Sequence, residues 1–350
     1  MSNIFIWGRK NLYPTTGQGI ISIAIVSLVG LVLWNFLPWS IFNAVWVADN
    51  SDVCRQAGGA CWAFIWEKLY FILFGFYPAE ERWRAWLVLA LFLGGILYSG
   101  RSKSWTLSLI VVWLGLVVSM MLLLNGTLLG LPTVETSYWG GLVLTIILAM
   151  TGIIFSYPFG VLLALGRANQ RLPVIRGICV SIIEIIRGVP FISLLFMASL
   201  MLPLFLPSGF VIPKLVRAIV AVIIFSGCYL AETVRGGLAA VSRGQYEAAQ
   251  SLGLSYWKTM GLVILPQALS KVIQPTVGSF ISLFIDTTLV VIISMYDLLG
   301  AARAAASDSA WLGFAREAYV FLALIYFAFC YTLSKYSRRL EKDILTKKVH

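Results

Sequence analysis

Long apolar stretches constrain this chain more than any other feature of its sequence. Apolar residues make up 60% of its 350 residues and charged residues 12%, against about 45–50% and 25% in soluble globular proteins. Because about 20 apolar residues in a helix cross the hydrocarbon of a bilayer, we predict an all-α polytopic membrane protein with about eight transmembrane helices. The predicted spans are 20–38, 85–99, 105–124, 139–165, 177–206, 215–234, 272–295 and 317–334.

The net charge of +11 would suggest nucleic-acid binding in a soluble chain. Here the basic residues concentrate in alternate connections between spans and in the tail after span eight, as the positive-inside rule describes. This pattern predicts cytoplasmic N- and C-termini and excludes a nucleic-acid partner. The first span is too long for a secretory signal and lacks a small-residue cleavage site, so we interpret it as an anchor.

The sequence divides near residue 135. Residues 1–135 hold three spans and an aromatic-rich outer loop, residues 136–340 hold five spans, and 341–350 form a predicted cytoplasmic tail. Cys54 and Cys61 lie in the outer loop and would form a disulfide in an oxidising compartment. Sequence spacing alone leaves that pairing open.

The stretch QYEAAQSLGLSYWKTMGLVIL, residues 245–265, is too polar at Glu247 to be a span. Good helix formers precede Gly253, which suits a left-handed C-terminal cap, and Ser255 suits the N-cap of a second helix. Pro266 would end or bend that helix. The pattern predicts a helix, a sharp turn and a second helix over 245–262, with Tyr246, Ala249 and Leu252 on nearby faces. An amphipathic connector resting on lipid headgroups is the alternative.

The same stretch resembles the EAA loop in the membrane subunits of bacterial ABC importers. The pattern is Glu-Ala-Ala, three residues, Gly, nine residues, an aliphatic residue, any residue and Leu-Pro. Its matching residues are Glu247, Ala248, Ala249, Gly253, Val263, Leu265 and Pro266. Flanking segments such as IIEIIRGVPFISLLF (182–196) are similar to the polar-amino-acid branch, and GGACWAFIWEKLYFILFGFYP (58–78) resembles the general L-amino-acid permeases, closest to the M-type subunit.

This resemblance implies a type I importer half with a coupling helix at 245–262. Its implied partners are two copies of a cytoplasmic ATP-binding subunit, a second permease subunit that is more often a paralogue than a copy, and a periplasmic amino-acid-binding protein. The implied location is the bacterial inner membrane. The implied coupling residues are Tyr246, Glu247, Ala248, Ala249, Leu252, Gly253 and Pro266.

The sequence has no GxxxxGK[ST] phosphate-binding loop, which is the motif that cradles nucleotide phosphates. We therefore expect no enzymatic activity and no cofactor on this chain, with ATP and Mg²⁺ bound by the partner subunit. No metal site is predicted.

Polar residues within two spans are candidates for the substrate pathway. Glu184 and Arg187 are three residues apart and would pair on one helix face, next to a helix break at Gly188 and Pro190 that is tolerated where it lines a cavity. A structural pair near the cytoplasmic edge is the alternative.

Asp286, Thr287 and Thr288 lie deep in the seventh span, where an ionisable residue costs about 2.5–3.5 kcal/mol on insertion scales. Asp286 would meet a substrate ammonium or a cation of a neighbouring helix, and the threonines would donate to a substrate carboxylate. Relatives usually have a basic residue where this chain has Ile285. This substitution leaves the role of Asp286 open.

Glu232 and Arg235 are also three residues apart, and we interpret them as a surface pair. Asp297 begins an outer loop and is interpreted as a capping or turn residue, with contact to the binding protein as the alternative. The rival functions are an ion-gradient-driven secondary amino-acid transporter and a membrane scaffold, and neither requires the EAA spacing.

Overall fold

The computed structural model describes residues 13, 15–101, 107–207 and 209–347, and helices are the regular elements among them, with no named strand. The chain divides into two compact units. Unit 1 comprises 1–69 and 306–320, and unit 2 comprises 70–305 and 321–350. The stretch before residue 13 and the first residues of the predicted 105–124 span lie outside the described part, as do 348–350 of the predicted tail.

Unit 1 contains one long apolar helix, α2, and a group of shorter elements that we call the cap. Its elements are α2 (Thr16–Leu37), the π-turn η1 (Pro38–Phe42), α3 (Ser51–Ala57), the start of α4 (Trp62–Phe74), the short η9 (Ser309–Trp311) and the start of α16 (Ala315–Lys347). A disulfide joins Cys54 to Cys61 with their Cα atoms 5.5 Å apart. The cysteine pair that the sequence left open is therefore bonded in the structure.

Contacts between distant segments hold the cap of unit 1 together. The backbone N–H of Cys61 donates to the buried Glu317 carboxylate at 3.1 Å, and Phe64 packs against the rings of Trp311 and Phe314. A hydrogen bond from Lys68 holds the pKa of the Asp308 carboxyl below its usual value.

Unit 2 contains the remaining long helices. They are α5 (Arg82–Arg101), α6 (Leu107–Asn125), α7 (Gly141–Ala168), α8 (Pro173–Gly188), α9 (Phe191–Phe196), α10 (Lys214–Ala239), α11 (Arg243–Ser251), α12 (Tyr256–Lys258), α13 (Leu265–Lys271), α14 (Ile273–Asp286) and most of α15 (Leu298–Ala306). The π-turn η7 (Thr259–Ile264) joins α12 to α13, and the 3₁₀ segment η8 (Thr287–Ile293) continues α14.

Helices α7 and α10 cross closely at the centre of unit 2 because small residues lie at their contact. A Cβ added to Gly160 of α7 would lie 2.7 Å from the carbonyl oxygen of Gly227 on α10. The buried core beside this crossing includes Leu163 of α7, Ile183 of α8 and Ala231 of α10. It extends to Met260 and Ile264 of η7. This core connects the bundle to the segment that carries the EAA pattern.

The helices agree with most of the predicted spans. Six described segments are long and apolar enough to cross a membrane: Thr16–Phe42, Ala79–Gly100, Gly141–Ala168, Lys214–Ala239, Ile273–Ile293 and Ala315–Lys342. The pair Pro173–Gly188 and Phe191–Phe205 counts as a seventh if it forms one broken span. The described part of the predicted 105–124 span is the shorter apolar helix Leu109–Asn125. The exact number of eight spans therefore remains a prediction, and the domain boundary near residue 135 rests on the sequence alone.

Candidate functional site

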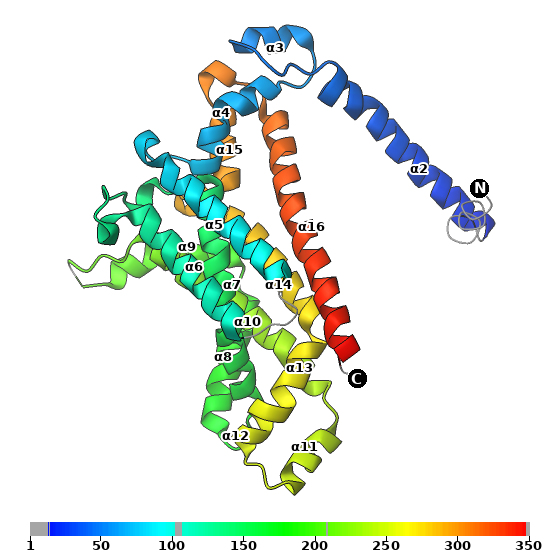
Figure 1. Cartoon of the computed structure of the whole chain (residues 1–350), viewed down its shortest axis with the longest axis vertical. Coiled ribbons are helices and arrows are strands. Elements are labelled where there is room, and N and C mark those ends of the chain that lie inside the picture. Colours follow the sequence, from blue (N-terminus) through cyan, green and yellow to red (C-terminus); the bar gives the residue numbers. More distant parts are fainter. Residues whose placement is uncertain (1–12, 14, 102–106, 208, 348–350) are drawn as a thin grey trace. The chain divides into compact units, whose positions relative to one another are not determined.

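The EAA segment forms two helices joined by a tight turn at one end of unit 2 (Figure 1). Gly253 ends the first helix, α11, with φ +74°, a left-handed conformation that glycine adopts without steric cost. The N–H of Gly253 donates to the Gln250 carbonyl at 2.9 Å, and that of Leu254 to the Ala249 carbonyl at 3.1 Å. The predicted glycine cap is therefore present, and it fixes the direction of the chain after α11.

The faces of α11 divide the predicted contact residues into two groups. Ala249 is buried and Tyr246 is partly buried against the core beside α7 and α10, and burial raises the pKa of the Tyr246 phenol. Glu247, Ala248 and Leu252 are exposed, and Leu252 has 80% of its surface exposed. Of the predicted coupling residues Tyr246, Ala249 and Leu252, the first is partly buried, the second is buried and the third is exposed, and their role in coupling stays a prediction.

The second helical run is longer than the sequence suggested. Ser255 occupies the N-cap position, although its side chain makes no capping hydrogen bond. Pro266 does not end the helix, because the π-turn η7 precedes it and the run continues through α13 to Lys271. A wider turn leaves room for a residue that lacks an N–H. Pro266 was predicted to end or bend the helix; it does not end it, and the helical run breaks at Val272.

Several side-chain contacts fix this segment to the rest of unit 2. The guanidinium of Arg171 lies over the Tyr256 ring, 5.3 Å from its centroid, and Gln267 donates to the Gln245 side chain at 3.0 Å. Lys271 donates to the Ala240 carbonyl just before α11. These contacts attach the chain on both sides of α11 to the rest of unit 2. Among the residues that the structure describes, none forms an ion pair or hydrogen bond with the Glu247 carboxylate.

An ion network joins α7, α8 and α10 beside this segment. Glu232 of α10 contacts Arg167 at 3.2 Å and Arg187 at 3.6 Å, and it also pairs with Arg235 on its own helix. Arg167 in turn lies 2.9 Å from Glu184. The predicted pair between Glu184 and Arg187 does not form, because each finds a partner on another helix.

Arg167 was not among the residues singled out from the sequence, although it is central to this network. Its only sequence signal is that it ends a long apolar span at a basic connection. The predicted pair of Glu232 and Arg235 is present. Its interpretation as a surface pair is incomplete, because Glu232 also holds two arginines from other helices and has 21% of its side chain exposed.

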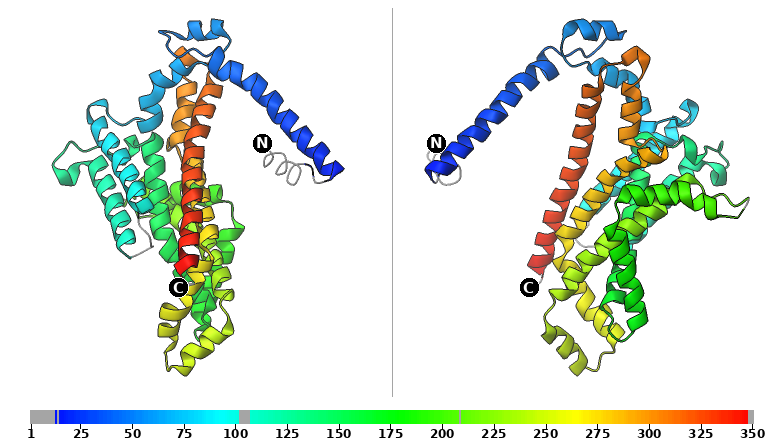
Figure 2. Two further views of the ribbon diagram at one scale, coloured as in Figure 1. Left: turned by 45° about the vertical axis from the view of Figure 1, so that its right-hand side comes forward. Right: turned by 180° about the vertical axis from the view of Figure 1, so that it is seen from behind.

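The predicted helix break lies at the end of α8. Gly188 is the last residue of α8 and Pro190 is the N-cap of α9. The two halves of this segment are bent by 104° (Figure 2). Arg187, directly before the break, lies over the Tyr229 ring at 5.4 Å. The break therefore lies one residue from the ion network.

Asp286 is the last residue of α14, where the α-helix changes to the 3₁₀ segment η8. It is partly buried, and within the described part of this chain no cation pairs with its carboxylate. Thr287 is fully buried, and its hydroxyl donates to the Phe284 carbonyl at 2.8 Å. In this structure the hydroxyl proton of Thr287 is used in that hydrogen bond, and donation from Thr287 to a substrate stays a prediction. Thr288 is partly buried.

Asp297 is fully buried at the start of α15, and it accepts a hydrogen bond from the Gly300 N–H at 2.8 Å. Burial raises the pKa of this carboxyl to about 6. The structure therefore gives Asp297 a capping role, as the sequence suggested. A buried side chain does not offer a surface to a binding protein.

Residues 156–345 match the family described as binding-protein-dependent transport system inner membrane component. The chain is 45% identical over 99% of its length to the inner membrane amino-acid ABC transporter permease protein YhdY of Escherichia coli K12, and covers 94% of that relative. It is 36% identical over 97% of its length to the glutamate/glutamine/aspartate/asparagine transport system permease protein BztC of Rhodobacter capsulatus, and covers 93% of it.

A crystal structure of an amino acid ABC transporter with histidines has a chain that is similar to part of this one. The TM-score is 0.51 and the sequence identity 32%. The similarity covers 58% of this chain and 91% of that chain.

Proposed function

This chain belongs to the family of binding-protein-dependent transport system inner membrane components, and on that premise we propose that it is the membrane subunit of an ATP-driven amino-acid importer. The observation that carries the proposal is the similarity of nearly the whole chain to a permease of an amino-acid ABC transporter. Similarity of this extent does not support the alternative of a secondary transporter driven by an ion gradient.

The exposed side of α11 is the surface that we assign to the ATP-binding subunit. Glu247, Ala248 and Leu252 offer a carboxylate, a small side chain and an apolar side chain on one projecting helix. The opposite face of the same helix, through the partly buried Tyr246, packs against the core of unit 2. Movement of an ATP-binding subunit that is bound to α11 is therefore transmitted to α7 and α10, because packed cores shift as units and do not deform continuously.

The ion network extends this mechanical path to the broken span. Glu232 and Arg167 connect α10 and α7 to Glu184 and Arg187 on α8, and α8 ends at the break. In the proposed mechanism, closure of the ATP-binding subunits displaces α11, and the network carries that displacement to the segment that opens or closes the pathway.

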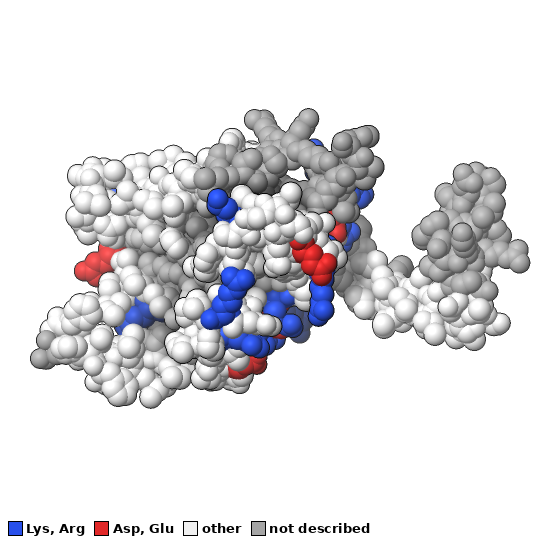
Figure 3. Space-filling model, turned by 90° about the horizontal axis from the view of Figure 1, so that it is seen from below, with Lys and Arg blue, Asp and Glu red and all other residues white. Residues whose placement is uncertain are grey.

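Charge supports the orientation that we propose for unit 2. Seen from the end that carries α11 and α12, lysine and arginine side chains clearly outnumber acidic ones (Figure 3). Under the positive-inside rule this end faces the cytoplasm. With the eight spans predicted from the sequence, both chain termini would be cytoplasmic, and ATP and Mg²⁺ would bind to the partner subunit.

The proposed assembly contains two ATP-binding subunits, a second permease subunit that is a paralogue, and a periplasmic binding protein that delivers the amino acid. We propose polar or broad amino-acid specificity, which is supported by the glutamate, glutamine, aspartate and asparagine in the name of the relative in Rhodobacter capsulatus. We place the substrate pathway beside the break at Gly188 and Pro190 and beside Asp286 and Thr288.

The test of this function is uptake by the reconstituted complex. We expect proteoliposomes that contain this chain, its second permease, the ATP-binding subunit and the binding protein to accumulate radiolabelled glutamate, glutamine or aspartate when ATP is supplied. Accumulation that follows a sodium or proton gradient and persists without ATP would favour the secondary transporter instead.

We expect Asp286→Asn to change transport kinetics more than assembly. Loss of the carboxylate removes a charge from a partly buried position without changing the shape of the side chain. The KM for one class of amino acid should rise by about ten- to 150-fold, as for one lost hydrogen bond to a charged group, while the amount of assembled complex stays the same. Unchanged kinetics for acidic, neutral and basic amino acids would remove Asp286 from the pathway.

We expect Gly253→Val to weaken binding of the ATP-binding subunit. A Cβ at Gly253 meets open space, so the cost arises from the left-handed backbone and is about 1–2 kcal/mol. Gly244→Val is the matched control, because Gly244 lies on α11 with open space around it and without a positive φ. Co-purification of the ATP-binding subunit should fall for Gly253→Val alone, and equal yields for both variants would contradict the role of this turn.

A further inference from the structure

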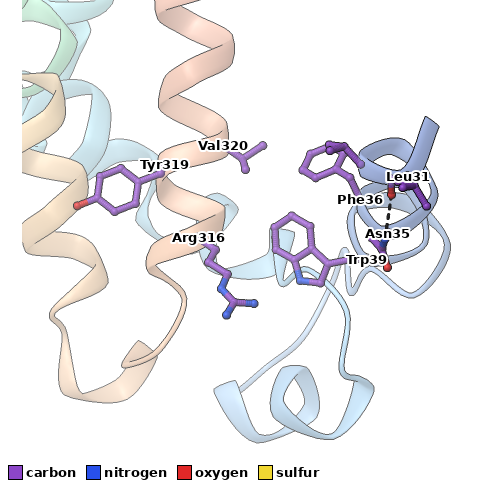
Figure 4. Close-up of a pocket in the computed structure, with 8 residues that line it drawn as sticks. Leu31, Asn35, Phe36, Trp39, Arg316, Tyr319 and Val320 are labelled. Atoms are coloured by element: carbon purple, nitrogen blue, oxygen red, sulfur yellow. Dashed lines mark hydrogen bonds between the residues drawn. The ribbon is translucent and has the colours of Figure 1, made fainter. Parts of the chain in front are cut away.

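A groove lies in unit 1 between α2 and the first turns of α16 (Figure 4). Its volume is about 680 Å³, within the range of about 300–1,000 Å³ that small-molecule sites occupy. Phe36 and Trp39 reach into it from the α2 side, and Arg316 and Val320 reach into it from α16. An apolar wall and a cation therefore border the same space.

The side of the groove formed by α2 is an exposed apolar surface, as expected for contact with lipid hydrocarbon. Gly19 is the one residue of α2 that is buried within the structure, and large side chains such as Leu31 are exposed. The polar amide of Asn35 donates to the Leu31 carbonyl at 2.8 Å, so it is satisfied within its own helix. The apolar side chains of this wall, such as those of Leu31 and Phe36, are suited to contact with an acyl chain.

Arg316 supplies a positive charge at one end of the groove. Its side chain is exposed, and none of the described residues forms an ion pair with it. The adjacent Glu317 is buried, and its carboxylate accepts a hydrogen bond from the Cys61 N–H. This carboxylate therefore does not pair with Arg316. Arginine binds phosphate through two parallel N–H donors, which makes a phosphate the complementary anion.

The position of this charge along the spans agrees with a lipid headgroup. Arg316 is the second residue of the span Ala315–Lys342, and Trp39 lies near the end of the span Thr16–Phe42. Tryptophan settles where hydrocarbon meets headgroups. The groove thus offers apolar contacts along its length. Its guanidinium lies at the level of the membrane where lipid phosphates lie.

We propose that this groove binds one anionic phospholipid, with an acyl chain between Phe36 and Val320 and the phosphate on Arg316. A single phospholipid carries both the apolar chain and the anion that the two walls require. A transmembrane helix of another protein would fill the apolar space and leave the guanidinium of Arg316 without the anion.

Native mass spectrometry of the full-length chain, purified in mild detergent and titrated with defined lipids, tests this proposal. We expect phosphatidylglycerol to bind more tightly than phosphatidylcholine at one site. Arg316→Gln should weaken phosphatidylglycerol binding roughly five-fold, as loss of one basic contact predicts, and should leave phosphatidylcholine binding unchanged. Arg316→Lys should retain most of the affinity.

Two further variants separate this site from general attraction to the lipid surface. Lys214→Gln removes an exposed cation that also lies at the end of a span, and it should leave phosphatidylglycerol binding unchanged. Val320→Trp fills the groove while keeping Arg316, and it should weaken binding of the same lipid.

Equal phosphatidylglycerol affinity in the original chain and in Arg316→Gln would overturn the proposal. An equal loss in Lys214→Gln would also overturn it, because the effect would then belong to surface charge in general. A photo-cross-link from position 320 to another subunit, in an assembled complex, would show that a protein helix fills the groove and would contradict a lipid there.

Discussion

Replacing Glu247 with arginine is expected to stop ATP-driven uptake while the chain still reaches the membrane in normal amount. Glu247 is exposed on α11 and has no partner among the described residues, so its removal takes no contact away from the chain's own fold. Surface substitutions of this kind usually change stability by less than about 0.5 kcal/mol. Glu247→Arg should therefore affect only the contact between α11 and the ATP-binding subunit.

The size of the effect follows from the charge that Glu247 is proposed to meet. Truncating one partner of an interfacial charge pair costs about 2–5 kcal/mol, and a cost of 2 kcal/mol already weakens docking about thirty-fold. Charge reversal adds repulsion to this cost. Uptake of labelled amino acid, normalised to the amount of permease in the membrane, measures the loss.

Glu247→Gln separates the loss of charge from its reversal and should have an intermediate effect. Gln250→Arg is the matched control for the added cation, because Gln250 is exposed on the same helix. Normal uptake by Glu247→Arg, at normal abundance, would count against docking through this carboxylate.

Glu232→Gln is expected to destabilise the core of unit 2 and to reduce uptake together with it. The substitution leaves Arg167, Arg187 and Arg235 near one another without the carboxylate that they share. Exposed pairs contribute up to about 1 kcal/mol, and breaking a fully buried pair costs about 3–5 kcal/mol. Because 21% of the Glu232 side chain is exposed, we expect a loss of about 1–3 kcal/mol.

The matched control is Glu184→Gln, at a carboxylate of the same network that holds one arginine and has 54% of its side chain exposed. We expect this control to cost less than about 1 kcal/mol. Thermal unfolding of the purified complex compares the two variants. Adding Arg235→Gln to Glu232→Gln should restore part of the stability, since it relieves the repulsion among the arginines. Equal stability of the two single variants would show that Glu232 is not the centre of the network.

The spans were predictable because the bilayer imposes one strong requirement, a helix with about 20 apolar residues. The predicted 139–165 and 215–234 correspond to Gly141–Ala168 and Lys214–Ala239 in the structure, with differences only at their ends. The turn at Gly253 was predictable for a similar reason, because a left-handed residue at a helix end favours glycine.

Contacts between helices were not predictable from local pattern. Arg167 and Glu232 are separated by 65 residues, and nothing in the sequence near either one indicates the other. The phase of α11 was also undetermined, because Ala248 and Ala249 are adjacent and chemically identical, and only packing decides that the second is buried. At Pro266, which was expected to end or bend the helix, the preceding π-turn η7 allows the helical run to continue.

Site-directed cross-linking from α11 shows whether the ATP-binding subunit docks on this helix. A photoactivatable thiol reagent on Ala248→Cys, at an exposed position of α11, should cross-link to the ATP-binding subunit in membranes that contain the assembled complex. The same reagent on Lys214→Cys, at the opposite end of α10, should give no such product, and neither should the chain without an introduced cysteine. A complex that transports amino acids but gives no cross-link from position 248 would contradict docking through α11.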